Sequence, residues 1–186
     1  MFAGHLAAGL ILKKMERRLN LGWLFFASLF HDVLFGTFVL LGWEQVHIPA
    51  NFAQTHYMTF TFPYSHGLTA SIVWSALGFG IAYAVLPHWA SKERKRAGLA
   101  IAFAVFSHFV LDWMVHIPEL PLFGNDSPKI GLGLWNNLPL ALTLEAALVV
   151  ISFVFYIFML KPKTNLARYG LATFMLMITV LTVTGM

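Results

Sequence analysis

Residues 97–117, AGLAIAFAVFSHFVLDWMVHI, form an apolar stretch that is long enough for one helix across a membrane. The stretch contains three ionisable side chains, His108, Asp112 and His116, with four residues from each to the next. At about 100° per residue, this spacing keeps all three within an arc of about 80° on one helix face. A carboxylate near the membrane centre costs at least about 2.5–3.5 kcal/mol. Either a bound divalent metal ion or a hydrogen-bonded polar cluster between helices would offset that cost.

The composition of the whole chain is that of an integral membrane protein. The chain has 186 residues, of which 59% are hydrophobic and 11% charged, and its mean hydropathy is +0.73. These values exclude an ordinary soluble domain. Cysteine is absent, so a metal site would have to use His, Asp and Glu side chains. The net charge of +4 requires no nucleic-acid partner, because the basic residues cluster at the ends of the apolar segments.

The apolar segments predict an all-α integral membrane protein with a single domain, residues 1–186. A segment of about 20 apolar residues matches the ~30 Å hydrocarbon core of a bilayer. A shorter apolar run covers residues 2–12 and predicts a short N-terminal helix embedded in the membrane. The expected bundle therefore has five transmembrane helices plus this short helix. The five segments are residues 21–43, 66–87, 97–117, 138–160 and 166–185.

Basic residues mark alternate ends of these segments. Residues 13–18 and 92–96 each contain four Lys or Arg, and residues 161–168 contain three. Residues 44–65 contain none, and residues 118–137 contain only Lys129. Because basic loops stay on the cytoplasmic side, this alternation predicts that the three basic loops are cytoplasmic and that the two long loops face outward. The expected location is the inner (cytoplasmic) membrane of a bacterium.

Polar side chains from several segments are expected to meet in the outer half of the membrane. Counting about 1.5 Å per residue upward from the basic loops places them at similar depths. His31 is a neighbour of Asp32 but points about 100° away around a helix, so Asp32 is the preferred site residue of the two. The residues expected to converge are His5, Asp32, His66, His108, Asp112 and Glu145.

Short motifs around these residues resemble one known family. The motifs are Gly4-His5-Leu6, Phe30-His31-Asp32, Pro63-Tyr64-Ser65-His66 and Ser107-His108-x3-Asp112-x3-His116-x-Pro118-Glu119. In this order they resemble the bacterial membrane-bound metal-dependent hydrolases, which are often compared with zinc-dependent phospholipases C. The resemblance continues through Trp135-Asn136 to Glu145, so it covers about residues 3–147.

The resemblance implies roles for individual residues. It implies that His116 and Glu145 are ligands or catalytic acid/base groups. Common members of the family carry a Pro-Asp-x-Asp-His-like stretch near the second segment, whereas this chain retains only the carboxylate of Asp32 there. The number of ions, one or two, therefore stays open. The metal ligands implied by the resemblance are His5, Asp32, His66, His108 and Asp112.

A ligand set of His, Asp and Glu suits Zn²⁺, Mn²⁺ or Fe²⁺, with Zn²⁺ favoured because imidazole dominates. The expected reaction is hydrolysis of a phosphoester or ester in a lipid-like substrate that enters from the outer leaflet, with membrane lipids as surroundings. Two other classes stay open. In an accessory subunit of a membrane complex, the polar cluster would only hold the helices together by hydrogen bonds. A proton-coupled carrier would use Asp32, Asp112 and Glu145 as a relay, but the sequence shows no inverted repeats.

Overall fold

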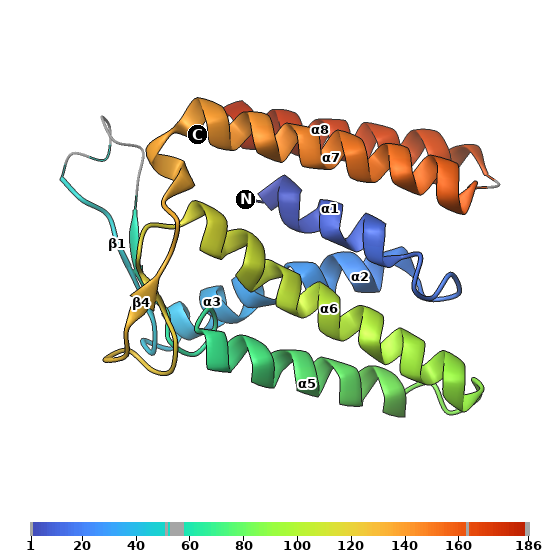
Figure 1. Cartoon of the computed structure of the whole chain (residues 1–186), viewed down its shortest axis with the longest axis horizontal. Coiled ribbons are helices and arrows are strands. Elements are labelled where there is room, and N and C mark those ends of the chain that lie inside the picture. The colour runs from blue at the N-terminus through green and yellow to red at the C-terminus, as the bar shows by residue number, and fades with distance from the viewer. Residues whose placement is uncertain (1, 51, 53–57, 163, 185–186) are drawn as a thin grey trace.

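The computed structural model describes residues 2–50, 52, 58–162 and 164–184, which form a mostly helical molecule (Figure 1). Two antiparallel hairpins, each of two short strands, lie at one end of the helices. The strands are β1 (Gln45–His47), β2 (Thr59–Thr61), β3 (Leu120–Pro121) and β4 (Lys129–Ile130). The helices are α1 (Phe2–Leu12), α2 (Leu21–Ser28), α3 (Phe30–Leu40), α5 (Leu68–Ala84), α6 (Ser91–Val115), η1 (Leu134–Asn136), α7 (Leu138–Leu160), η2 (Leu166–Gly170) and α8 (Leu171–Thr184).

Within the described residues, three helical stretches are long and apolar enough to cross a membrane. They are Ser91–Val115, Leu138–Leu160 and Leu166–Thr184. A fourth span exists if α2 and α3, which are bent by 50° at their junction, count as one. This structure is consistent with the predicted helical fold and with a membrane protein. The predicted count of five spans is not confirmed. The predicted segment 166–185 also includes Gly185, and the basic loop 161–168 includes Lys163, both of which lie outside the described residues.

Two predicted segments differ from the structure for physical reasons. The segment 21–43 is interrupted at Leu29, whose backbone (φ −103°, ψ 5°) departs from α-helical geometry. The segment 66–87 begins with a turn, so that α5 starts at Leu68 and has 17 residues. Since a helix rises about 1.5 Å per residue, α5 is about 25 Å long, slightly less than the hydrocarbon core.

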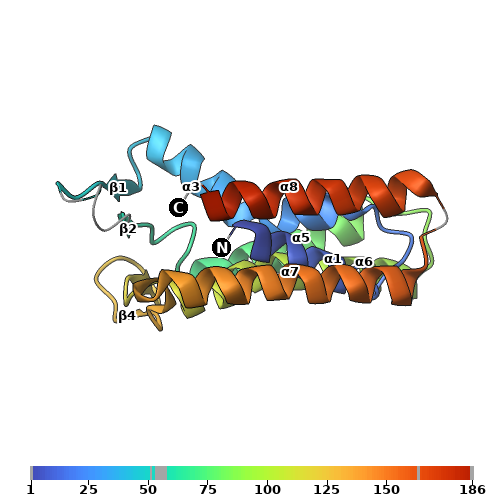
Figure 2. The ribbon, with the colours of Figure 1, turned by 90° about the horizontal axis from the view of Figure 1, so that it is seen from above.

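Helix α6 is the central element of the bundle, because it contacts α1, α2, α3 and α5. Its closest neighbour is α5, and a glycine permits that approach. A Cβ added to Gly98 would lie 2.8 Å from the ring of Phe79. On the other side, α1 packs against α7 and α8, and these two helices run along the same face of the molecule (Figure 2). The residues at the centre of the bundle are therefore those of α1 and α6.

The basic segments meet at one end of the bundle and the two hairpins at the other (Figure 1). At the basic end, Arg17 donates to the carbonyl of Met159 at 2.8 Å and Arg18 pairs with Glu93. At the hairpin end, the backbone N–H of Phe60 donates to Glu119 at 3.0 Å. The chain is therefore polarised as the Lys and Arg distribution predicts, while the side of the membrane that each end faces stays a prediction.

Candidate metal centre

Asp112 lies at the centre of a cluster of imidazole rings. Its side chain projects from the last turn of α6 into the bundle, and only 3% of the residue is exposed. Oδ1 lies 3.2 Å from His5 Nε2, whereas Oδ2 lies 3.1 Å from His108 Nε2 and 3.4 Å from His66 Nε2. A fourth ring, that of His116, places its Nε2 3.8 Å from Oδ2. Oδ1 of Asp112 therefore faces His5, and Oδ2 faces the other three histidines.

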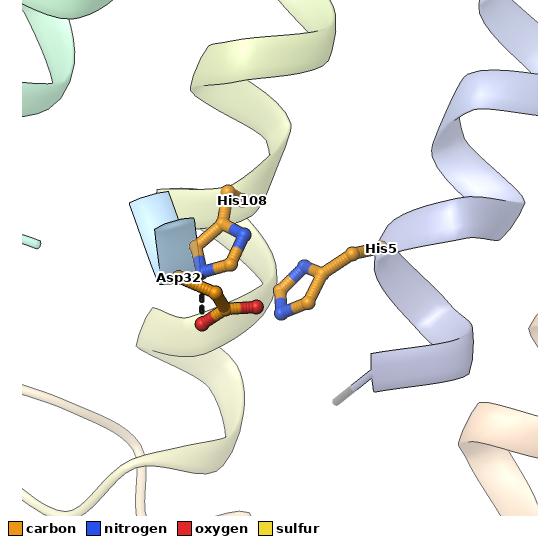
Figure 3. A group of neighbouring side chains, drawn as sticks. All are labelled: His5, Asp32 and His108. Carbon is orange, nitrogen blue, oxygen red and sulfur yellow. Dashed lines mark ion pairs between the residues drawn. The ribbon is translucent and has the colours of Figure 1, made fainter. Parts of the chain in front are cut away.

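Asp32 adds a second carboxylate from α3. Its Oδ1 lies 3.5 Å from His108 Nε2 and 3.7 Å from His66 Nε2. His5 from α1, Asp32 from α3 and His108 from α6 point toward one another (Figure 3). Two overlapping groups have donor atoms within 4.8 Å of one another and could hold a metal ion. They are His5, Asp32 and His108 in one group, and His66, His108 and Asp112 in the other.

The structure therefore brings together all five residues that the sequence predicted as metal ligands. They come from α1, α3, the turn before α5, and α6, which are distant in sequence. A cavity of about 360 Å³ opens onto four of them, His5, Asp32, His66 and Asp112, while His108 is fully buried behind it. Its remaining lining is mostly aromatic and consists of Phe2, Phe35, Phe60, Phe62, His116 and Trp135.

The tautomer of His108 follows from its second nitrogen. His108 Nδ1 lies 2.8 Å from the backbone carbonyl oxygen of Ser28, at the junction of α2 and α3. A carbonyl oxygen can only accept, so Nδ1 carries the proton and donates. In the neutral ring, Nε2 is then left with a lone pair that points at the two carboxylates.

The tautomer of His66 follows from a chain of two hydrogen bonds. Ser65 Oγ donates to Glu44 Oε2 at 2.6 Å, because an ionised carboxylate is only an acceptor. Having donated its single proton, Ser65 Oγ can only accept from His66 Nδ1, which lies 2.7 Å away. The Nε2 atom of neutral His66 therefore also carries a lone pair.

These tautomers create a convergence of acceptors. His66 Nε2 and His108 Nε2 are 3.1 Å apart, and both face the same oxygen of Asp112. Three electron-rich atoms at such distances repel one another unless a proton or a cation lies among them. Two imidazole nitrogens and a carboxylate oxygen are ligands that Zn²⁺ accepts readily. The donor set therefore fits a divalent metal ion.

His116, predicted as a catalytic group or ligand, is held by an acidic partner. Its Nδ1 lies 2.6 Å from Glu119 Oε1, and the other oxygen of Glu119 accepts from Phe60 N–H. A carboxylate that fixes one ring nitrogen while the other faces the site is the usual outer-shell arrangement at metal-binding histidines. The ring of His116 also contacts Trp135, with 4.5 Å between the ring centroids.

Glu145, the other predicted catalytic group, has a different environment. Its carboxylate is buried and accepts a hydrogen bond from the backbone N–H of Gly4 at 2.9 Å. This N–H belongs to the first turn of α1, where helix N–H groups lack partners within the helix. Within the described part of the chain, Glu145 belongs to neither metal-binding group. Its partner Gly4 directly precedes His5 in α1.

Sequence reasoning assigned no role to Glu44 and Ser65, and it set His31 aside. His31 is fully buried, stacks on His108 with 4.8 Å between centroids, and shares a 2.9 Å hydrogen bond with Ser71 Oγ. The ring of His31 therefore packs against the ring of His108 and helps to fix its orientation. The signal for Glu44 was present, since it is the only charged side chain in residues 44–65.

No family model, curated protein or solved structure matches this chain. The resemblance of its motifs to membrane-bound metal-dependent hydrolases therefore stays a prediction. The chemistry of the site has to be argued from its own geometry.

Proposed function

We propose that this protein is a membrane-embedded, metal-dependent hydrolase that cleaves a phosphoester or ester bond in a lipid-like substrate. The observation that carries the proposal is the convergence of His66 Nε2, His108 Nε2 and Asp112 Oδ2 within 3.1–3.4 Å of one another. A divalent ion among them would replace three mutual repulsions with three coordination bonds. In the resembled family, this part of the motif pattern supplies the metal ligands.

Room for two ions is part of the proposal. Asp112 directs Oδ2 to His66 and His108 and Oδ1 to His5, so its carboxylate can bridge two positions. Asp32 lies beside the second position and is less buried than Asp112, with 45% of its side chain exposed toward the cavity. Zn²⁺ suits the imidazole-rich set best, and Mn²⁺ or Fe²⁺ are alternatives. A bound ion of this kind supplies Lewis-acid polarisation of the substrate and a nucleophile at neutral pH.

The side chains around the site support a lipid-like substrate. The cavity next to Asp112 is lined chiefly by aromatic rings, which favour an apolar group beside the bond that is cleaved. His116 faces the cavity with Nε2, while Glu119 holds its Nδ1–H, so that Nε2 is ready to accept a proton. His116 is therefore the preferred acid/base group, and Glu145 is the second choice because it is bonded to Gly4.

The proposal includes the topology expected from the sequence. α5 would serve as a fifth crossing, with the basic end in the cytoplasm of a bacterial cell and the hairpin end outside. The cavity would then be reached from the outer leaflet. Membrane lipids would be both the surroundings and the source of substrate.

Metal content tests the proposal directly. Elemental analysis of the protein purified without chelator should find one or two equivalents of zinc, manganese or iron. His108→Ala should lose most of this metal, because His108 belongs to both groups of ligands. His88→Ala is the matched control, since His88 is exposed and lies in the short turn between α5 and α6. Metal-loaded wild type should then hydrolyse phosphodiester or ester lipids in mixed micelles, and His108→Ala should not.

An accessory subunit is the second candidate, and hydrogen bonds between helices favour it. The Glu145–Gly4 bond joins α7 to α1, and the His31–Ser71 bond joins α3 to α5. In this case a protonated imidazole would pair with Asp112, and the cluster would only hold helices together for other membrane subunits. A wild-type protein that contains no metal and takes up none from added Zn²⁺ would overturn the hydrolase proposal and favour the accessory subunit.

A further inference from the structure

Glu44 lies in an unusual position for an acidic residue of a loop. It lies in the turn between α3 and β1 and is 1% exposed, although it belongs to the hairpin end of the molecule. A tight turn explains why it faces inward. Gly42 adopts a positive φ of 75°, which a residue with a Cβ rarely adopts, and the N–H of Trp43 then bonds to Phe38 O at 2.8 Å. The chain thus folds back over the end of α3 and places the Glu44 carboxylate against Tyr64 and Ser65.

The Glu44 carboxylate is occupied by three donors from one short segment. Oε1 accepts from the backbone N–H groups of Tyr64 and Ser65, each at 2.8 Å. Oε2 accepts from Ser65 Oγ at 2.6 Å. These bonds hold the turn that precedes α5, and His66 is the next residue in that turn.

We propose that Glu44 is a positioning residue that sets the tautomer of His66 through Ser65. This inference rests on the proposed metal site. The carboxylate has no proton to donate, so the Ser65 hydroxyl must point toward Glu44 and can only accept from His66. His66 must then carry its proton on Nδ1 and keep Nε2 free as a ligand. Outer-shell partners of this kind tune the orientation and basicity of a ligand histidine.

The same geometry gives Ser65 a specific role. Ser65 is fully buried, and its hydroxyl is bonded to Glu44 on one side and to His66 on the other. The histidine of a nucleophilic serine accepts the serine proton, whereas here the serine accepts from the ring. Ser65 is therefore a relay between Glu44 and His66 and not a nucleophile.

Replacement of Glu44 by Gln is a sharp test because it keeps the shape and reverses the polarity. The amide oxygen can still accept from Tyr64 and Ser65 N–H, while the amide NH₂ faces Ser65 Oγ and donates to it. The Ser65 hydroxyl is then free to donate to His66 Nδ1, which moves the ring proton to Nε2. An Nε2–H group cannot bind a metal ion, so the ligand is lost without loss of volume.

The experiment compares wild type, Glu44→Gln and Glu16→Gln, each as the whole 186-residue chain in nanodiscs. Glu16 is the matched control, because it is also buried and accepts from a backbone N–H, that of Arg18, but lies at the basic end. Nitrogen-15 NMR of the metal-free protein should find His66 as the Nδ1–H tautomer in wild type and Glu16→Gln, and as Nε2–H in Glu44→Gln. Competition with a chelating dye should find Zn²⁺ affinity reduced about 10- to 100-fold only in Glu44→Gln.

Further variants separate the possible failures. Ser65→Ala leaves the backbone bonds of Glu44 in place but removes the relay, so it should also lower Zn²⁺ affinity. This variant provides the test if Glu44→Gln does not fold. Ser65→Thr keeps the hydroxyl and should restore wild-type affinity. If wild type binds no Zn²⁺, the proposed function fails, while the NMR comparison still tests the role of Glu44. An Nδ1–H tautomer and unchanged affinity in Glu44→Gln would overturn the inference and leave the metal site standing.

Discussion

Asp112 is the residue on which the centre of this protein depends. It lies within 3.8 Å of ring nitrogens from four histidines, which come from α1, the turn before α5, and the end of α6. A buried carboxylate with so many neighbours is costly when it has no compensating charge. A divalent ion would supply that charge. A purely structural cluster would join the helices by hydrogen bonds alone. The two roles respond differently to removal of the charge.

Asp112→Asn should abolish metal binding and leave a folded protein. The amide retains the shape of the carboxylate but neither its charge nor its second acceptor oxygen. An ion present at 100 times its dissociation constant stabilises the native state by about 2.7 kcal/mol. A chelator should therefore lower the melting temperature of wild type and have little effect on Asp112→Asn. Asp126→Asn, in an exposed loop, should respond to chelator as wild type does. Equal and negligible responses in all three proteins would remove the metal hypothesis.

Substitutions of Glu145 distinguish a structural from a catalytic role. Glu145→Gln keeps an oxygen that can accept from Gly4 N–H, so the variant should match wild type in thermal stability and metal content. Glu145→Ala leaves that buried N–H without its partner, which costs about 1–3 kcal/mol. Stability and zinc content of both variants provide the measurement. If Glu145→Gln retains its metal but loses hydrolysis, the catalytic role implied by the resemblance would hold.

At the scale of elements, the loop between β4 and η1 (residues 131–133) fixes the end of α6. The backbone N–H of Leu132 donates to Trp113 O at 2.8 Å, and that of Gly133 donates to His116 O at 2.7 Å. Gly131 lies so close that an added Cβ would overlap the carbonyl oxygens of His116 and Ile117. The position of His116 therefore depends on a loop that is distant in sequence.

Gly131→Ala should displace the end of α6. Overpacking of this kind costs about 1–3 kcal/mol, and here it moves the backbone of His116. The expected results are a lower melting temperature and weaker Zn²⁺ binding. Gly80→Ala is the control, because no atom lies within 4 Å of its added Cβ, and it should be neutral or slightly stabilising. Unchanged zinc affinity in Gly131→Ala would mean that this loop does not hold Asp112, in the last turn of α6, in its place.

The sequence predicted a mostly helical, apolar molecule, because apolar length and loop charge are local properties, but its count of five spans is not confirmed. It also predicted the convergence of His5, Asp32 and Asp112, because depth in a membrane follows from counting residues along each helix. It did not predict the break at Leu29, where the Ser28 carbonyl meets His108. Nor did it predict the bond between Glu44 and Ser65. These features depend on how segments distant in sequence pack together, which no local pattern encodes.

At the scale of the whole molecule, the two ends differ in charge and in structure. The three basic segments lie at the same end, and Arg96 of α6 donates to Met15 O at 2.7 Å there. At the other end, the first turn of α5 contacts the second hairpin through the bond from Thr69 N–H to Leu122 O at 3.0 Å. This arrangement fits a single orientation in a membrane.

Reporter fusions test that orientation. Fusions at residues 92–96 and 161–168 should report the cytoplasm, and fusions in residues 44–65 and 118–137 should report the outside, because Lys and Arg are retained on the cytoplasmic side. Replacement of the Lys and Arg residues of 92–96 by Gln should weaken this preference. An outside signal from 92–96 in the unaltered protein would reverse the orientation and place the metal centre near the inner leaflet.

The shortness of α1 has a consequence for biogenesis. Its 11 residues rise only about 16 Å, too little to cross a bilayer without support. It is held in place by α2, α6 and above all α7, which contributes the carboxylate that binds Gly4 N–H. His5 can therefore reach its final position only after the ribosome has released α7 (Leu138–Leu160). The first residue of the cluster to be translated is thus among the last to reach its position, and a metal ion held by the proposed site would be acquired late.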